Sequence, residues 1–241
     1  AQLDAAARIQ ANFLPKIPDF GPCNGIYAET RPAIFVGGDF YDVIPLHDGS
    51  YLVCVADVSG KGLPAALVGA SLWTRIRSLS ASIQSPGALL TALNKDMYDV
   101  LAQQLFATIV LGRYWPETGE ASVALAGHLP PMHIFRGSIT YCNSMEGVPI
   151  GIEPEGFFPE ITLRLGPQES LMFITDGVSE ARNPQRHFFG EERIAQCFVA
   201  KNAPPWGPSL VAAIESWRQG AEANDDLTVV EIWREDSACF P

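Results

Sequence analysis

The sequence has little positive charge and no basic run. Lys and Arg together number 16, against 27 Asp and Glu, so the formal net charge is −11. A surface that binds nucleic acid needs clustered Lys and Arg to neutralise phosphates. The composition therefore predicts no nucleic-acid partner. The acidity alone indicates little about metal binding, because most surface carboxylates only keep a protein soluble.

Cysteine is also scarce, and long hydrophobic segments are missing. The cysteines lie far apart, with no C-x-x-C pair among them: Cys23, Cys54, Cys142, Cys197 and Cys239. This odd-numbered, scattered set argues against a disulfide framework and a structural zinc site, and it favours a reducing compartment. No apolar run approaches the roughly 20 residues that cross a bilayer, and no signal-peptide pattern is recognisable. We expect a cytoplasmic domain without direct membrane insertion.

Several common catalytic motifs are missing as well. The histidines lack H-E-x-x-H spacing, which argues against a zinc hydrolase. No cysteine heads a phosphate loop that ends in Arg, which excludes cysteine-phosphatase chemistry. The stretch from Gly177 to Ala181 lacks the final Gly of the G-x-S-x-G elbow found in serine hydrolases. His128, in the Pro-rich turn 127–131, is expected to be a packed, hydrogen-bonded structural residue.

The hydrophobic pattern predicts blocks of strands and blocks of helices. Apolar residues recur every three or four positions after Pro64 and Pro86, as in amphipathic helices, and Ser85 is placed to cap the second helix. The predicted helices cover 5–14, 65–83, 86–100, 191–199 and 209–219; the predicted strands cover 51–56, 105–111, 121–126, 134–135, 139–142, 161–165, 171–175 and 227–233. Strands in hairpins with helices in two blocks indicate an α+β layered sandwich, not a doubly wound parallel sheet.

Four motifs place aspartate beside a strand-like apolar run. They are Gly37-Gly38-Asp39, Ala56-Asp57-Val58-Ser59-Gly60, Thr175-Asp176-Gly177 and Asp225-Asp226-Leu227-Thr228. A single such aspartate usually serves as a cap, turn or surface charge. Four carboxylates at the ends of buried strands are costly unless their charge is compensated, so together they predict a divalent metal site. Mg²⁺ and Mn²⁺ prefer oxygen ligands, and two ions about 4 Å apart can share one carboxylate. Asp57 is the natural bridge because it ends the most buried predicted strand.

Two other motifs are misleading. The segment 60–65 matches the dinucleotide fingerprint G-x-G-x-x-A, but residues 80–84 supply neither the second strand nor the acidic residue that this fingerprint requires. It is not a phosphate-binding P-loop either, because Gly62 occupies the Ser/Thr position. The segment 37–40 resembles the GGDEF signature of diguanylate cyclases without its Glu. We expect the glycines of 60–65 to let the backbone approach a charged centre closely.

Six segments occur in an order that resembles a known family. They are 36–42 (VGGDFYD), 57–67 (DVSGKGLPAAL), 106–108 (FAT), 126–131 (AGHLPP), 175–178 (TDGV) and 225–228 (DDLT). Together they resemble the SpoIIE/RsbU branch of the PPM metal-dependent serine/threonine phosphatases over roughly residues 27–233. The resemblance implies an α-β-β-α sandwich in which helices flank two central, mostly antiparallel sheets. A pair of manganese or magnesium ions is implied at one end of these sheets.

The resemblance also implies a ligand set for the two Mn²⁺ or Mg²⁺ ions. In this set Asp57 bridges the metals, the Val58 backbone carbonyl is a further ligand, Asp39 serves one metal, and Asp176 and Asp225 serve the other. Asp226 remains an alternative to Asp225, which aligns with the first acid of the family's closing motif. No catalytic group is implied beyond a metal-bound water that attacks phosphorus.

The chain departs from larger PPM phosphatases at two places. Those proteins carry Asp-Gly-His-Gly, with the His placed to protonate the leaving alkoxide, whereas this chain has Ser59 there. They also carry a phosphate-binding Arg shortly before the first acidic motif, where this chain has Ala33, Ile34 and Phe35. Arg31 or Lys61 is left as a candidate phosphate ligand, and the substrate-binding residues stay open.

The implied activity is hydrolysis of phosphoserine or phosphothreonine on a STAS-domain anti-sigma-factor antagonist in a bacterial partner-switching pathway. Two other classes of function are considered. One is a degenerate phosphatase fold that acts as a regulatory binding scaffold; the intact motifs count against it, because nothing physical would keep unfavourable carboxylates together without a metal. The other is a metal-dependent cyclase or phosphodiesterase, which turnover of nucleotides would reveal.

The ends of the chain are interpreted as parts of a larger arrangement. Residues 1–26 are expected to be a truncated linker helix and lead-in from an upstream sensor or receiver domain, since the predicted helix lacks an N-cap and stops at Pro15. Residues 27–235 would form the phosphatase domain, and 236–241 a C-terminal tail. The two helices after Asp57 resemble the family's regulatory switch, and a homodimer is possible.

Overall fold

The computed structural model describes residues 2–101, 105–143, 147–199, 201 and 203–235. The predicted tail at 236–241, with Cys239, lies outside the described residues. The helices are α1 (Gln2–Ala11), α2 (Leu63–Ser80), α3 (Pro86–Leu101), α4 (Asp176–Ser179), α5 (Gly190–Val199) and α6 (Gly207–Arg218). The strands are β1 (Asn24–Arg31), β2 (Phe40–Pro45), β3 (Tyr51–Val58), β4 (Ala107–Tyr114), β5 (Glu120–Ala126), β6 (Met132–Phe135), β7 (Ser138–Tyr141), β8 (Glu160–Arg164), β9 (Glu169–Ile174) and β10 (Leu227–Arg234).

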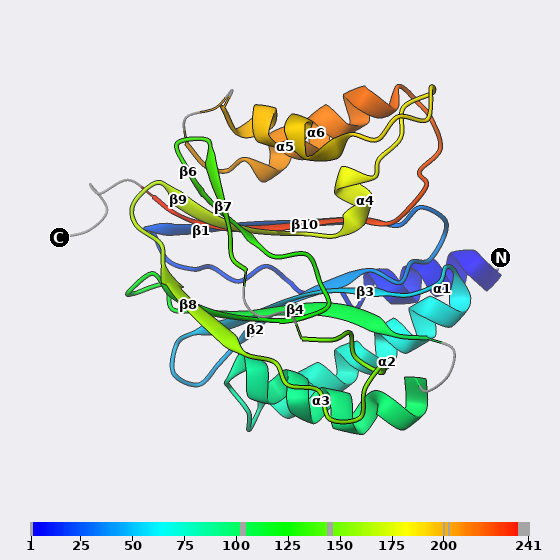
Figure 1. Ribbon diagram of the computed structural model, residues 1–241, viewed down its shortest axis with the longest axis vertical. Coiled ribbons are helices and arrows are strands. Elements are labelled where there is room, and N and C mark those ends of the chain that lie inside the picture. Colours follow the sequence, from blue (N-terminus) through cyan, green and yellow to red (C-terminus); the bar gives the residue numbers. More distant parts are fainter. Residues whose placement is uncertain (1, 102–104, 144–146, 200, 202, 236–241) are drawn as a thin grey trace.

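The strands form two five-stranded sheets that lie face to face. One sheet has the order β1-β10-β9-β6-β7 and the other β2-β3-β4-β5-β8. Every pairing between these strands is antiparallel. Helices α5 and α6 cover the outside of the first sheet, and α2 and α3 cover the outside of the second (Figure 1). The predicted α+β sandwich with α-β-β-α layering is confirmed.

Three hydrophobic clusters fill the spaces between the layers. The central cluster, between the sheets, includes Val55 and Phe173. A second cluster under α2 and α3 includes Cys54 and Leu72, and a third under α5 and α6 includes Trp206. Because successive residues of a strand point to opposite faces, β3 contributes to both the central cluster and the second one. This two-sided burial explains why β3 is apolar without alternation.

The helices below the second sheet follow their predicted pattern closely. The buried positions of α2 recur at intervals of three and four residues: Ala65, Gly69, Leu72, Ile76 and Ser80. The N-terminus of α3 is capped as predicted, because the Ala88 amide donates to Ser85 Oγ at 3.1 Å. Helix α2 ends three residues before the predicted boundary, since the amides of Ser82 and Ile83 both turn back to Leu79 O.

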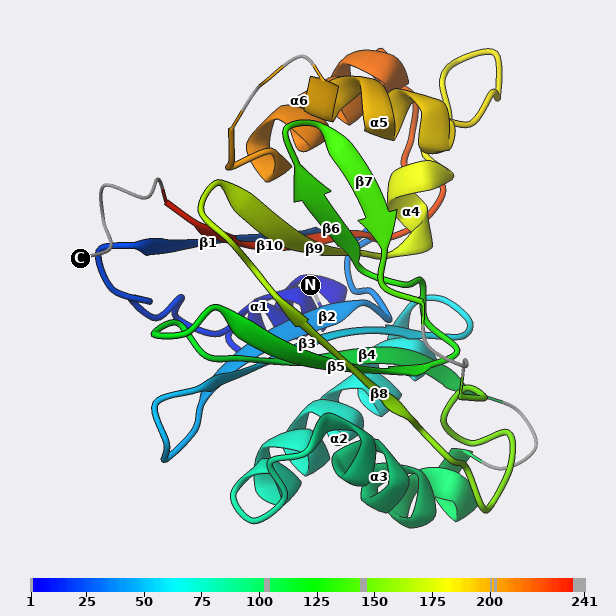
Figure 2. The ribbon, with the colours of Figure 1, turned by 60° about the vertical axis from the view of Figure 1, so that its left-hand side comes forward.

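Other element boundaries also differ from the sequence prediction. Strand β4 starts at Ala107 rather than 105, because the Leu105 amide still bonds to Leu101 O at the exit of α3. The single-turn helix α4 was not predicted, and it starts at Asp176 directly after β9. Helix α1 has no fully buried residue and lies at the edge of the sandwich beside β2 and α2 (Figure 2). Within the described residues, no helix has the length and apolar content to cross a membrane.

Candidate metal centre

The predicted aspartates come from both sheets and meet at one end of the sandwich. In the second sheet, Asp39 immediately precedes β2 and Asp57 lies near the end of β3. The pairing of Phe40 with Ala56 places these two carboxylates on adjacent antiparallel strands. In the first sheet, Asp176 follows β9 and the pair Asp225-Asp226 precedes β10. Strands β9 and β10 are also neighbours, so all the predicted carboxylates belong to one end of the fold.

Asp39 is the most enclosed of these carboxylates. Its side chain is buried, and its Oδ2 accepts hydrogen bonds from Thr175 Oγ1 at 2.7 Å and Thr228 Oγ1 at 2.9 Å. Burial, and after it the charge of Asp57, raises the pKa of Asp39 well above its usual range, while the two threonine hydroxyls oppose that shift. The ionised form of Asp39 is therefore unfavourable unless hydrogen bonds or a cation compensate its charge.

The other carboxylates repel one another in the same way. Burial, together with the charges of Asp176, Asp225 and Asp226, raises the pKa of Asp57 to about 6, against a hydrogen bond with Asp39 that lowers it. Burial and the charge of Asp225 likewise raise the pKa of Asp176. Mutual pKa raising of this kind shows that the carboxylates lie close enough to share one electrostatic field.

Asp225 is partly exposed, and a lysine partly neutralises it. Lys61 Nζ lies 3.1 Å from Asp225 Oδ2 and also donates to Asn224 O at 2.5 Å. Lys61 precedes α2, so this ion pair joins the start of α2 to the loop before β10. Arg31, the other candidate for phosphate binding, is instead paired with Glu29 and Glu215. Of the two candidates, only Lys61 contacts the acidic site.

Asp226 has a different environment from Asp225. Its Oδ1 accepts a hydrogen bond from the Ala33 amide at 2.7 Å, and its Oδ2 accepts one from the Gly38 amide at 2.8 Å. A Cβ on Gly37 would lie 2.2 Å from Asp226 Oδ2, so only glycine leaves room for this carboxylate. Both oxygens are thus engaged by the backbone of the β1–β2 loop. These bonds favour Asp225 over Asp226 as the ligand from the closing motif.

The segment after Asp57 is held close to its neighbours. The Val58 carbonyl oxygen would lie 2.7 Å from a Cβ on Gly38, so this glycine lets the two backbones approach. Ser59 and Phe106 exchange two hydrogen bonds, one from the Ser59 amide to Phe106 O and one from the Phe106 amide to Ser59 Oγ, each 2.9 Å. The Ser59 hydroxyl therefore joins β3 to β4, and this contact occupies the side chain that stands in place of the histidine of larger relatives.

His128 is a structural residue, as predicted. Its Nδ1 is 2.8 Å from Thr108 Oγ1, and its Nε2 is 3.2 Å from the Ile174 carbonyl oxygen. A carbonyl only accepts, so Nε2 carries the proton and Nδ1 accepts from Thr108. Burial lowers the pKa of His128 to about 4, which keeps the ring neutral. The ring borders a cavity of about 220 Å³ that Asp57 and Asp176 also line.

The donor chemistry fits hard divalent cations. Every predicted side-chain donor is a carboxylate, and oxygen ligands are those that Mg²⁺ and Mn²⁺ prefer. Within the described residues, no three or more His, Cys, Asp or Glu side chains lie in an arrangement that could hold a metal ion as it stands. One of these carboxylates already has a cationic partner, because the Lys61 ammonium lies 3.1 Å from Asp225 Oδ2. A divalent ion would compensate the remaining charges and relieve the mutual repulsion.

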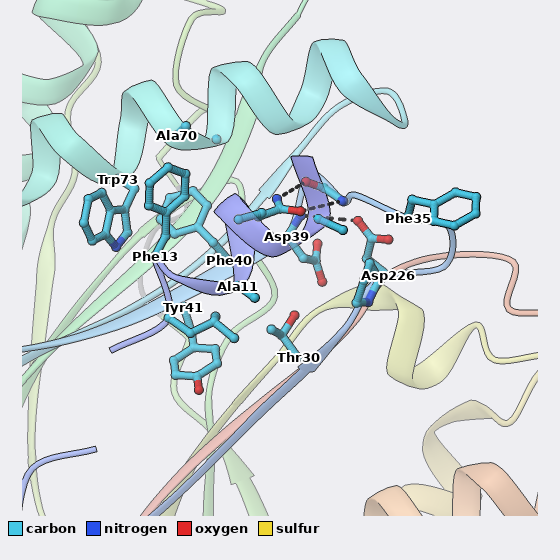
Figure 3. Close-up of a pocket in the computed structure, with 16 residues that line it drawn as sticks. Ala11, Phe13, Thr30, Phe35, Asp39, Phe40, Tyr41, Ala70, Trp73 and Asp226 are labelled. Carbon is cyan, nitrogen blue, oxygen red and sulfur yellow. Dashed lines mark hydrogen bonds between the residues drawn. The ribbon is translucent and has the colours of Figure 1, made fainter. Parts of the chain in front are cut away.

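Two features of the site were not predicted from the sequence. One is the pair of threonine hydroxyls on Asp39. The other is a contact from α1: the Gln10 side-chain amide donates to Gly37 O at 2.7 Å and accepts from the Gly37 amide at 3.1 Å. This contact borders a second cavity, also about 220 Å³. Figure 3 shows Phe13, Phe40 and Trp73 on one side of that cavity, and Thr30, Asp39 and Asp226 on the other.

An antiparallel α-β-β-α sandwich with an acidic site at one end of its sheets is the architecture expected of a PPM-type domain (Figure 1). The sequence profile of the family described as Stage II sporulation protein E (SpoIIE) matches residues 47–235. The match covers most of the chain, which therefore belongs to the SpoIIE family. The predicted membership of the SpoIIE/RsbU branch is confirmed.

Two curated relatives share 26% identity with the chain. Protein IcfG of Synechocystis aligns over 97% of this chain and 41% of its own length. Phosphoserine phosphatase RsbU of Bacillus subtilis aligns over 76% of this chain and 54% of its own length. The chain thus spans about half the length of the curated relatives it matches.

Solved structures share the fold over almost the whole chain. The SiaA-PP2C domain of Pseudomonas aeruginosa superposes with a TM-score of 0.80 at 21% identity, covering 96% of this chain and 94% of that one. The RsbU and RsbW domains of Rv1364c from Mycobacterium tuberculosis give 0.72 at 25% identity, covering 89% and 60%. RsbX, solved in complex with magnesium, gives 0.66 at 13% identity, covering 89% and 97%.

Proposed function

We propose that this chain hydrolyses phosphoserine or phosphothreonine in a protein substrate, using two Mn²⁺ or Mg²⁺ ions at the acidic site. The observation that carries the proposal is the meeting of Asp39, Asp57, Asp176 and Asp225 from two separate sheets, with the pKa of Asp57 raised to about 6 by burial and by its acidic neighbours. Bound ions would supply Lewis acidity and an activated water nucleophile. The family relationship supports the same chemistry.

Each residue of the site has a role in this proposal. Asp57 would hold both ions, because it interacts with Asp39 and with the charges of Asp176 and Asp225. The Val58 carbonyl would add a neutral oxygen ligand next to it. Asp226 is assigned as the anchor of the β1–β2 loop rather than as a ligand, because both of its oxygens already accept backbone amides.

Lys61 is the proposed partner of the substrate phosphate. Its ammonium neutralises Asp225 at 3.1 Å, and a cation bound at Asp225 would release it toward an incoming phosphate. Neither Ser59 nor His128 is a suitable general acid: a serine hydroxyl is a very weak acid, and Ser59 Oγ accepts the Phe106 amide, while His128 stays neutral and bonded to Thr108 and Ile174. Solvent water is therefore the proposed source of the proton for the leaving alkoxide.

The proposed substrate is a phosphorylated STAS-domain anti-sigma-factor antagonist of a partner-switching pathway. Two relatives support this choice: RsbU, a phosphoserine phosphatase, and a protein whose structure contains RsbU and RsbW domains together.

We also propose that residues 1–26 connect the phosphatase domain, residues 27–235, to an upstream regulatory domain, with 236–241 as a tail.

The test is phosphate release from phosphorylated antagonists encoded in the same genome, with Mn²⁺ present and then chelated. Asp57→Asn and Asp176→Asn are each expected to abolish release, because each removes a charge from the proposed ligand set. Asp99→Asn, an exposed carboxylate on α3, is the matched control and should keep full activity. Activity that survives chelation, or full activity in Asp57→Asn, would overturn the metal mechanism. Antagonist binding without Mn²⁺ binding would identify a scaffold instead.

A further inference from the structure

The environment of Asp39 contains a chain of threonine hydroxyls that crosses between the two sheets. Asp39 belongs to the second sheet, whereas Thr175 and Thr228 belong to the first. Thr228 Oγ1 is in turn 2.8 Å from Thr30 Oγ1 on the neighbouring strand β1. Thr30 and Thr228 face each other in the register of β1 and β10. Two hydroxyls therefore converge on one buried carboxylate oxygen, and the third lies behind Thr228.

Proton counting gives this chain a direction. A hydroxyl has one proton to donate, and Thr228 Oγ1 donates its proton to Asp39 Oδ2. Thr30 must then be the donor in its bond with Thr228. Thr175 is used in the same way: it donates to Asp39 Oδ2 at 2.7 Å and accepts the Thr228 backbone amide at 3.0 Å. The Thr175 and Thr228 hydroxyls thus both donate to Asp39, and the Thr30 hydroxyl donates to Thr228.

From this geometry we infer that Thr175 and Thr228 are positioning residues for the metal ligand Asp39, an inference that rests on the proposed metal-dependent function. Their hydroxyls engage Oδ2 and leave Oδ1 out of both bonds. They also stabilise the ionised carboxylate, which is the form that binds a cation. Thr30 supports Thr228 from the side of the cavity under α1, which both Thr30 and Asp39 line (Figure 3).

The experiment measures Mn²⁺ binding directly, without substrate, from the signal of free Mn²⁺ in electron paramagnetic resonance. Thr228→Val keeps the side-chain shape but removes the hydroxyl, and it should weaken Mn²⁺ binding by roughly 10- to 100-fold, the usual loss when a hydrogen-bond partner of a metal ligand is removed. Thr228→Ser restores the hydroxyl and should bind within a few-fold of the unmodified chain. Thr140→Val, on the exposed strand β7, is the matched control and should bind normally.

The outcomes separate positioning from simple stability. Unchanged Mn²⁺ binding in a folded Thr228→Val variant would overturn the inference, as would equal weakening in Thr228→Val and Thr228→Ser. If Thr228→Val does not fold in chelator, Thr30→Val decides. That change leaves both bonds to Asp39 in place but removes the donor behind Thr228, so a weakening of a few-fold is expected and none would refute the inference. An unmodified chain that binds no Mn²⁺ would instead refute the proposed function itself.

Discussion

Asparagine in place of Asp226 should destabilise the fold, even without any metal. The Asp226 carboxylate accepts the Ala33 amide at 2.7 Å and the Gly38 amide at 2.8 Å through different oxygens. Asparagine would turn one of these oxygens into an NH₂ group that faces a backbone donor. One charge-assisted bond is then lost and the other is weakened, which together should cost about 2 to 4 kcal/mol.

The assay is thermal unfolding in the presence of chelator, so that metal binding does not contribute. At about 2 to 4 °C per kcal/mol for a chain of this size, the melting temperature of Asp226→Asn should fall by roughly 4 to 16 °C. Asp225→Asn is the matched comparison: it removes a half-exposed carboxylate that bonds to Lys61, so its melting temperature should change little while Mn²⁺ binding is lost. An Asp226→Asn variant that melts like the unmodified chain but binds no Mn²⁺ would refute the assignment of Asp226 as an anchor.

Two further predictions concern Lys61 and His128. Lys61→Met should raise the inhibition constant for inorganic phosphate several-fold without weakening Mn²⁺ binding, whereas Lys95→Met, at an exposed position of α3, should change neither. Weaker Mn²⁺ binding in Lys61→Met would contradict the exchange proposed for this lysine. Burial lowers the pKa of His128 to about 4 in the folded protein, from the ordinary value of 6.5. As the pH falls, the unfolded chain therefore binds the proton first, and the stability that the neutral ring contributes is lost between pH 6.5 and about 4. Relative to His128→Gln, the unmodified chain should lose on the order of 3 kcal/mol across that interval in urea unfolding, and equal slopes would contradict the buried neutral ring.

The sequence predicted the layers well because their signals are local. Each of these signals depends on only a few neighbouring residues: the interval of buried positions in α2, the Ser85 cap of α3 and the apolar run of β3. The roles of the individual aspartates could be predicted only from an ordered set of motifs that resembles a known family. Even this left Asp225 and Asp226 unresolved, because neighbouring positions in a motif carry the same chemistry.

The contacts around Asp39 could not be predicted from the sequence. Thr175 Oγ1 and Thr228 Oγ1 reach Asp39 from positions 136 and 189 residues away along the chain. Threonine is common in strands, so its presence beside a carboxylate motif gives no signal of its own. The Gln10 contact with Gly37 is equally non-local, since a helix with no fully buried residue has no apolar stripe to indicate where it docks.

The distribution of the carboxylates over both sheets has a thermodynamic consequence. Because Asp39 and Asp57 come from one sheet and Asp176 and Asp225 from the other, a metal pair can bind tightly only while the two sheets keep their native relation. Binding that requires the native state stabilises it by RT ln(1 + [M]/Kd). Under the proposed metal-dependent function, metal availability would therefore add to the resistance of the entire domain to unfolding and proteolysis, and the abundance of the protein would be linked to the ion that it uses.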